Sequence, residues 1–121
     1  MKYDDNNIFA KILSGKIPCN IIYEDDYVLS FYDINPQKKI HALVIPKGKY
    51  INLDDFVSNA TLEEMVGLLK GINTVAKKLE ISVDTGKGYR ALTNISEDGG
   101  QEVPHLHFHL FGGEKVGKMV Q

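Results

Sequence analysis

The stretch "HLHFHLFGG", residues 105–113, places three of the chain's four histidines at alternate positions, with apolar residues between them. Because side chains alternate between the two faces of a β-strand, a strand here directs His105, His107 and His109 to one face. The other face is apolar and suits a core beneath a helix; it consists of Leu106, Phe108 and Leu110. One strand is thus predicted to build core on one side and a functional site on the other.

The neighbouring segments predict the rest of a sheet. Residues 20–34 predict two strands joined by a turn at 24–26, residues 41–46 predict a third, and residues 89–95 predict a fourth. The histidine strand, 103–113, is the fifth. Short connections join most of these strands, which implies antiparallel pairing rather than β–α–β crossovers.

Two helices accompany the strands. Asn6 or Asn7 can cap a short helix that Gly15 ends in a left-handed turn. A long helix is predicted to begin at Thr61, because "TLEE" is a capping box in which Glu64 reaches back to the first residue. Its predicted apolar face consists of Leu62, Met65, Val66, Leu69, Ile72, Ala76 and Leu79. The expected fold class is α+β, a five-stranded antiparallel sheet with one long and one short helix.

Length and composition limit the class of protein. The 121 residues fit one domain, 1–121, and the 43% of hydrophobic residues can build a core. The net charge of −2 gives no reason to expect a nucleic acid or a membrane surface as partner. Cys19 stands alone, which favours a reducing, cytoplasmic setting, and the acidic N-terminus is unlike a secretory signal.

The histidine stripe has three interpretations. It could be an ordinary solvated strand face, or it could bind zinc, copper or iron through neutral imidazoles, with only His41 and Cys19 left as further His or Cys ligands. In the third, an unprotonated imidazole attacks phosphorus while a neighbouring one protonates the leaving group. Gly99 and Gly100, which also suit a plain turn, could present N–H groups to an anion. The combination favours phosphate chemistry without a metal or other cofactor.

At this point the sequence resembles the histidine triad (HIT) family, in its Hint branch. The triad itself is "HLHFHLF". Wider matches run through nearly the whole chain in one order: "IFAKILSGKIP", "YEDD", "FYDINPQ", "HALVIPK", "GYR" and "NISEDGGQEV". The resemblance implies the HIT-like fold and a homodimer whose sheets join edge to edge.

The resemblance also implies an activity, the binding of purine nucleotides and the hydrolysis of nucleoside phosphoramidates or acyl-adenylates. His107 would be the nucleophile that forms a covalent nucleotidyl-histidine. His109 would contact the phosphate or assist the leaving group, and His105 and His41 would orient and polarise the site from behind. The alternatives are a nucleotide-binding regulatory module with incidental catalysis and, more weakly, a metal-dependent hydrolase.

The nucleotide-binding residues follow from the same resemblance. Asp33 matches the acid that binds the ribose hydroxyls, although a turn residue before Asn35 and Pro36 is the alternative from the sequence alone. The base pocket would consist of Ile8, Phe9, Ile12, Phe31, Ile34 and Leu43. Further nucleotide contacts would come from Asn94, Gly100, Gln101, Glu102 and Val103.

Two features depart from the family pattern. Glu102 stands where many members have serine, and an ionised carboxylate cannot donate a hydrogen bond to phosphate. Glu102 is therefore expected to bind the leaving amine or to turn aside. The tail "EKVGKMVQ" matches poorly, so the sequence does not name the preferred substrate.

Overall fold

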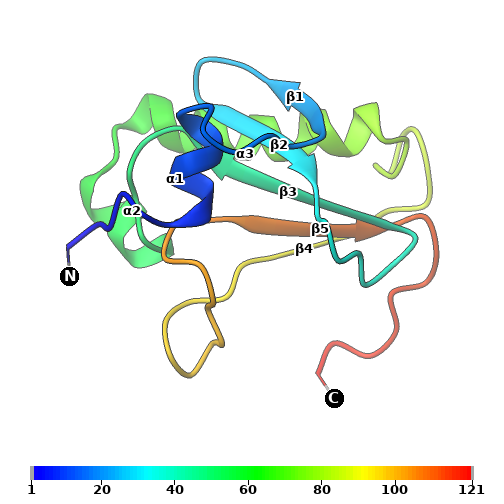
Figure 1. Cartoon of the computed structure of the whole chain (residues 1–121). Coiled ribbons are helices and arrows are strands. Elements are labelled where there is room, and N and C mark those ends of the chain that lie inside the picture. Colours follow the sequence, from blue (N-terminus) through cyan, green and yellow to red (C-terminus); the bar gives the residue numbers. More distant parts are fainter. Residues whose placement is uncertain (1, 121) are drawn as a thin grey trace.

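A computed structural model describes residues 2–120, so Met1 and Gln121, the two ends of the expected domain, lie outside the described residues. Its five strands form one antiparallel sheet in the order β1-β2-β3-β5-β4 (Figure 1). The strands are β1 (Ile21–Glu24), β2 (Val28–Tyr32), β3 (Ile40–Pro46), β4 (Arg90–Leu92) and β5 (Phe108–Gly112). The helices are α1 (Ile8–Leu13), α2 (Leu53–Asn59) and α3 (Leu62–Lys78). The predicted α+β class is confirmed.

The two faces of the sheet carry different clusters of buried residues. Alternation along β2 and β3 sends Val28, Ala42 and Val44 toward α3, and Leu29 and Leu43 toward α1. The α3 side continues through Leu106 and Leu110 with Ile22, Phe56, Leu68, Ile72 and Val75. The α1 side is smaller and consists of Phe9, Leu29, Phe31, Leu43 and Ile45. Figure 1 shows α1 and α3 on opposite sides of the sheet.

The helix ends follow the predicted signals. Asn7 caps α1 by accepting a hydrogen bond from the N–H of Ala10, and Gly15 beyond the helix has a φ of 81°. Thr61 and Glu64 form both bonds of the capping box at the start of α3. Helix α2 was not anticipated; Asn52 caps it by accepting from the N–H of Asp55.

The buried face of α3 differs from the predicted one. Leu62, Val66 and Leu69 are largely exposed. The buried residues include Gly67 and Gly71, with Leu68, Ile72, Val75 and Ala76. A Cβ added at Gly67 would lie 2.5 Å from the ring of Tyr27, and one at Gly71 would lie 2.7 Å from Val28. The helix therefore packs its glycines against the sheet, whereas the prediction considered only large apolar side chains.

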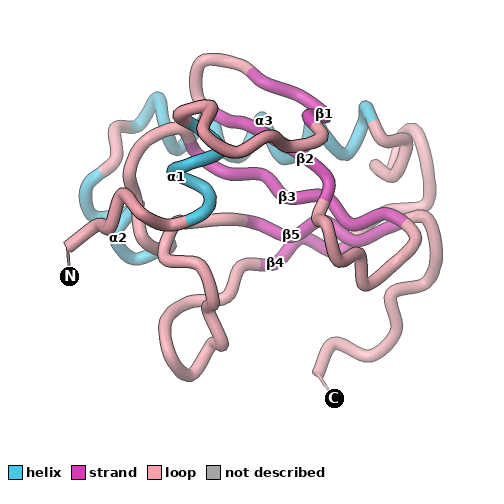
Figure 2. Tube along the Cα trace, viewed as in Figure 1, coloured by secondary structure: helices cyan, strands magenta, loops and turns pink. Residues whose placement is uncertain are grey.

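The histidine strand is shorter than predicted, because β5 begins only at Phe108. Pro104 has no N–H to donate to a ladder, and the N–H of Leu106 donates instead to the carbonyl of Tyr50, 2.8 Å away. The predicted fourth strand is also shorter and ends at Leu92. Figure 2 shows long loops around these two strands, including the one that connects them. His105 and His107 thus lie in irregular backbone that enters β5.

Within residues 2–120, no helix combines the length and the apolar character that crossing a membrane requires.

Candidate functional site

A pocket of about 370 Å³ lies on the α1 side of the sheet, which is at the lower end of the usual range for small-molecule sites. It lies where β3 and β5 pair, Leu43 opposite His109 and His41 opposite Phe111. Its lining brings together residues from four separate segments of the chain. They are Phe9, Asp33, Asn35, Gln37, His41, Leu43, Asn94, Gly100, Glu102, Val103, His107 and His109.

His107 is held in one tautomer by the backbone. Its Nδ1 lies 2.7 Å from the carbonyl oxygen of His105, and a carbonyl can only accept, so Nδ1 carries the proton. The neutral ring then has a free lone pair on Nε2. The backbone therefore fixes the tautomer of His107 through the carbonyl of His105. The carbonyl of His107 itself accepts from Thr93 Oγ1 at 2.7 Å, just beyond the end of β4.

His105 is fully buried behind the pocket and does not line it. Its Nε2 lies 2.9 Å from the carbonyl of Pro46 and must donate there, which leaves Nδ1 to accept from the hydroxyl of Tyr3 at 2.6 Å. Tyr3 and Phe9 also pack edge-on against the ring. His105 therefore anchors the segment whose carbonyl holds His107.

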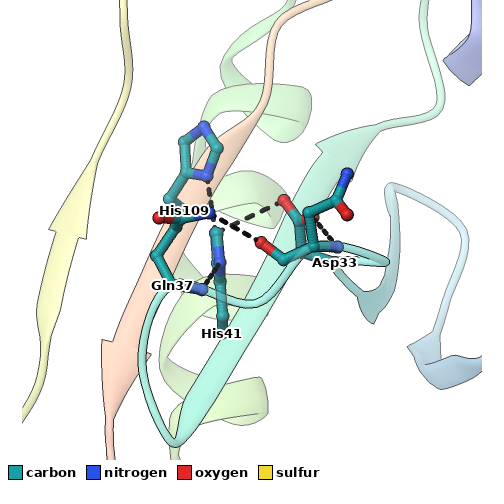
Figure 3. A network of polar contacts seen from close by, with 5 residues as sticks. Asp33, Gln37, His41 and His109 are labelled. Atoms are coloured by element: carbon teal, nitrogen blue, oxygen red, sulfur yellow. Dashed lines mark hydrogen bonds and ion pairs between the residues drawn. The ribbon is translucent and has the colours of Figure 1, made fainter.

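His41 and His109 form a chain of hydrogen bonds that begins at the backbone (Figure 3). The N–H of Gln37 donates to Nδ1 of His41 at 3.1 Å, so the proton of neutral His41 is on Nε2. That Nε2 donates to Nδ1 of His109 at 2.9 Å. The proton of neutral His109 is consequently on its own Nε2. The two catalytic candidates therefore differ: His107 exposes a lone pair, and His109 exposes an N–H.

All four rings favour the neutral form. Burial lowers the pKa of His105 to about 4. For His109, burial together with the neighbouring charges of His107 and His41 also lowers the pKa to about 4. Burial lowers the pKa of His107, against the opposing influence of the His105 carbonyl and of Asp33 and Glu102, and burial likewise lowers that of His41 against Asp33. Neutral imidazoles at pH 7 are what nucleophilic attack requires.

Asp33 makes the turn interaction that the sequence allowed, and it also lines the pocket. Its Oδ1 accepts from the N–H of Asn35 at 2.8 Å, which is the turn interaction. Its Oδ2 lies 3.4 Å from Nε2 of His41 at the edge of the pocket (Figure 3). The side chain is 19% exposed. A carboxylate with one oxygen so engaged keeps lone pairs for a ligand.

Asp33, His41 and His109 are also the residues, among those described, that could offer a metal three ligands, with donor atoms within 4.8 Å of one another. The Nε2 of His41 and the Nδ1 of His109 are already joined by a hydrogen bond. A metal would have to displace the proton between them. The metal alternative therefore concerns this cluster rather than the three histidines of the stripe.

Of the residues expected to form the base pocket, some lie at the pocket or in the apolar cluster behind it, and two are exposed. Phe9 and Leu43 line the pocket, and Phe31 is buried against Phe9, with ring centroids 5.6 Å apart. Ile12 packs beside the same cluster. Ile8 is 42% exposed and Ile34 is 87% exposed, so neither belongs to the apolar wall in this structure.

The backbone N–H groups of Gly100 and Gln101 in the glycine turn already have partners, unlike the expectation that the turn presents free N–H groups to an anion. Gly100 lines the pocket, but its N–H donates to the carbonyl of Glu97 and that of Gln101 donates to Ser96, so these two groups are not free for an anion. The side chain of Gln101 bonds Ile51 and Val103 and braces the loop outside the pocket. Asn94, Glu102 and Val103 do line it.

Sequence reasoning missed several residues that organise the histidines. Tyr3, Gln37 and Thr93 each hold a histidine through a hydrogen bond, and they lie 102, 4 and 14 positions away from it. Gln37 acts through its backbone, so no residue type marks it. Only the matching block "FYDINPQ" gave a local signal for Gln37.

The chain is similar to one family of known proteins in sequence and in fold. The family model for the HIT domain matches residues 14–116. An uncharacterised 13.2 kDa HIT-like protein of Azospirillum brasilense is 48% identical over 118 residues, which cover 98% of this chain and 94% of that protein. A solved HIT family hydrolase from Clostridium thermocellum has a TM-score of 0.85 at 39% identity, covering 98% and 99% of the two chains. A solved histidine triad protein from Clostridium difficile has a TM-score of 0.81 at 40% identity, covering 98% of each chain.

Proposed function

Since this chain belongs to the HIT domain family, we propose that it is a purine nucleotide hydrolase that cleaves the P–N bond of nucleoside 5'-phosphoramidates, or acyl-adenylates, as in the Hint branch. The observation that carries the proposal is the pair of opposite tautomers in one pocket. His107 presents an unprotonated nitrogen, and His109, with its ring centroid 5.1 Å away, presents an N–H.

In the first step, the lone pair of His107 Nε2 attacks the α-phosphorus and forms an N–P bond. The P–N bond to the leaving amine breaks, its electron pair stays on the amine nitrogen, and that nitrogen takes a proton from solvent, while the N–H of His109 Nε2 donates a hydrogen bond to the phosphoryl group. The His107 ring becomes positive as it is phosphorylated, and His109 stays neutral. The proton stays on Nδ1 of His107 throughout, hydrogen-bonded to the carbonyl oxygen of His105.

In the second step, water attacks the same phosphorus and the bond to His107 Nε2 breaks, returning the electron pair to the ring. The proton that water loses passes to solvent, which balances the proton taken up in the first step and restores the starting state. The product is a nucleoside monophosphate. Because the chain Gln37–His41–His109 is unchanged at the end, the tautomers are set for the next cycle.

The nucleoside would lie along the apolar wall of the pocket. Phe9 and Leu43, backed by Phe31, suit the face of a purine, and Asp33 is placed to accept hydrogen bonds from ribose hydroxyls. His107 and His109 line the same pocket, so a phosphate on that nucleoside would lie beside them. Asp33→Ala should therefore weaken nucleotide binding more than it weakens folding, which isothermal titration and thermal denaturation together measure.

The decisive experiment compares the wild type with His107→Ala on adenosine 5'-monophosphoramidate. We expect kcat to fall at least about a thousandfold, as when a catalytic nucleophile is removed. Nucleotide binding should persist in the variant. Because a phospho-imidazole is labile in acid, the covalent adduct of the wild type is sought by mass spectrometry at neutral pH. Turnover that survives in His107→Ala overturns the mechanism.

Two other outcomes identify the alternatives. Tight nucleotide binding without turnover by the wild type would favour a regulatory binding module. Loss of activity in chelator, regained with stoichiometric metal, would favour a metal-dependent hydrolase built on Asp33, His41 and His109. Full activity in chelator would remove that alternative.

Assembly and location are part of the same proposal. We propose a homodimer whose sheets join edge to edge, since the sheet ends in the short edge strand β4 and an unpaired edge favours association. Light scattering of the purified protein tests it. We also propose a cytoplasmic location, on the basis of the lone Cys19, which fractionation of cells tests.

A further inference from the structure

The charge of the pocket is unusual for a site that is to bind a phosphate. Its two charged lining residues are Asp33 and Glu102, both acidic, and no lysine or arginine lines it among the described residues. Asp33 is engaged by Asn35 and lies against His41. Glu102 is exposed and has no hydrogen bond or ion pair with another described residue. The pocket therefore contains a carboxylate without a partner of its own.

Glu102 and His107 lie at different depths. His107 is only 6% exposed, whereas Glu102 is on the exposed part of the lining. The carboxylate is still near enough that its charge acts on His107, where it raises the pKa against the influence of burial. Glu102 and His107 thus line the same pocket, with Glu102 on its exposed part.

The direction of the reaction brings the leaving group past this position. In phosphoryl transfer the attacking and leaving atoms lie roughly in line through phosphorus. With the attacking Nε2 near the buried floor, the leaving group points toward solvent and the exposed lining. A group attached to the leaving nitrogen is therefore closer to Glu102 than to the buried apolar residues that would hold the base.

We propose that Glu102 selects substrates by the charge of the leaving group, favouring phosphoramidates whose amine side carries a positive charge and disfavouring those that carry a carboxylate. This inference rests on the proposed phosphoramidase function and names the substrate class of that site. An ammonium group meets an unpartnered carboxylate, whereas a second carboxylate meets repulsion. The phosphate itself gains nothing from Glu102.

The test uses three adenosine 5'-phosphoramidates of similar size, with N-(2-aminoethyl), N-propyl and N-(2-carboxyethyl) groups. The measured quantity is kcat/KM, because it reports the steps up to departure of the amine and omits the later attack by water. For the wild type we expect the cationic substrate to exceed the neutral one about three- to tenfold, and the anionic one to fall below it by a similar factor, as for partly exposed charge pairs. High salt should narrow both differences.

Two variants complete the experiment. In Glu102→Gln the three values should agree within about twofold, because the charge is gone while the size is kept. Glu97→Gln removes a carboxylate from the same loop but outside this pocket, and should keep the wild-type order.

The outcomes distinguish a failure of the Glu102 inference from a failure of the proposed phosphoramidase function. Equal kcat/KM for all three substrates in the wild type, or an unchanged order in Glu102→Gln, overturns the inference alone. A uniform loss across the three substrates in Glu102→Gln also overturns it, since Glu102 would then act on the phosphate or the nucleophile. If the wild type cleaves none of the three, the phosphoramidase proposal and this inference fall together.

Discussion

The two faces of the sheet are both buried around residues 105–110, yet different forces hold them. Toward α3, Leu106 and Leu110 are at most 1% exposed and lie among aliphatic and aromatic side chains. Toward α1, His105 and His107 are buried almost as deeply, and each ring is held by a hydrogen bond to a backbone carbonyl. Apolar burial has no direction, whereas a buried ring nitrogen requires a partner at one place.

This difference explains why the histidine face is suited to chemistry. A leucine on the α3 face can be replaced by another side chain of similar volume with modest loss. The histidine face fixes the proton of each ring through Pro46, His105 and Gln37, because these backbone groups can only accept or only donate. Apolar burial on the α3 face stabilises the fold. On the α1 face, burial of the polar histidine rings costs free energy, and their hydrogen bonds fix the tautomers.

The largest expected effect on stability comes from the α3 face. Leu110→Ala should lower the free energy of unfolding by about 2–5 kcal/mol, because it removes a fully buried side chain and leaves a cavity. Urea denaturation measures the loss. The matched control is Leu69→Ala on the outer side of α3, where the side chain is 68% exposed and the loss should stay within about 0.5 kcal/mol. Equal losses would contradict the assignment of the two sides of α3.

The histidine face should weaken in acid. His105 has a pKa of about 4 when folded against an ordinary 6.5, so the unfolded chain binds its proton first. The stabilisation is complete above pH 6.5 and is lost as pH falls toward 4, by about 3 kcal/mol. Denaturation at a series of pH values measures it, and His105→Gln, which does not titrate, should lose less over the same interval. Parallel pH profiles would show that His105 is not the group responsible.

The activity should also depend on pH, through the protonation of His107. Burial lowers the pKa of His107, so the reactive neutral form persists below the ordinary value of 6.5. We expect kcat/KM to be level around neutral pH and to fall tenfold per pH unit only below that lowered pKa. An acid limb that begins above pH 6.5 would contradict a buried, neutral nucleophile.

A smaller effect tests the close approach of α3. Gly71→Ala should destabilise by about 1–3 kcal/mol although alanine is the better helix former, because its Cβ would lie 2.7 Å from Val28. Asn73→Ala, at an exposed position of the same helix, should instead leave stability unchanged or slightly raised. Thermal denaturation compares them. A stabilised Gly71→Ala would mean that the sheet and helix give way at this contact.

The smallest effect concerns the support of His105. Tyr3→Phe removes the hydroxyl that donates to Nδ1 but keeps the ring, and should cost about 1 kcal/mol, the usual value of one hydrogen bond. The control is Tyr32→Phe. Tyr32 is 40% exposed, and its side chain has no hydrogen bond among the described residues. If the two variants unfold at the same urea concentration, the Tyr3 bond contributes nothing to stability.

Local patterns proved reliable where the cause is local. The capping box at Thr61, the cap at Asn7 and the left-handed Gly15 depend on residues within one turn, and all three are confirmed. The buried face of α3 was wrong because its position depends on Tyr27 and Val28, which approach from another part of the chain. The extent of β5 was wrong because Leu106 bonds Tyr50 in place of a neighbouring strand.

The sequence by itself determined the two faces of the histidine segment, since alternation is a property of extended backbone and survives even where His105 and His107 leave the regular strand. It also determined the number of strands and their antiparallel pairing and, with the family resemblance, the candidate site residues, whereas the place of β5 between β3 and β4 came from the structure. Only the tertiary structure decided which nitrogen of each histidine carries the proton. That choice depends on Pro46, Gln37 and the carbonyl of His105, backbone groups that have no side-chain signature and become partners only when the chain folds.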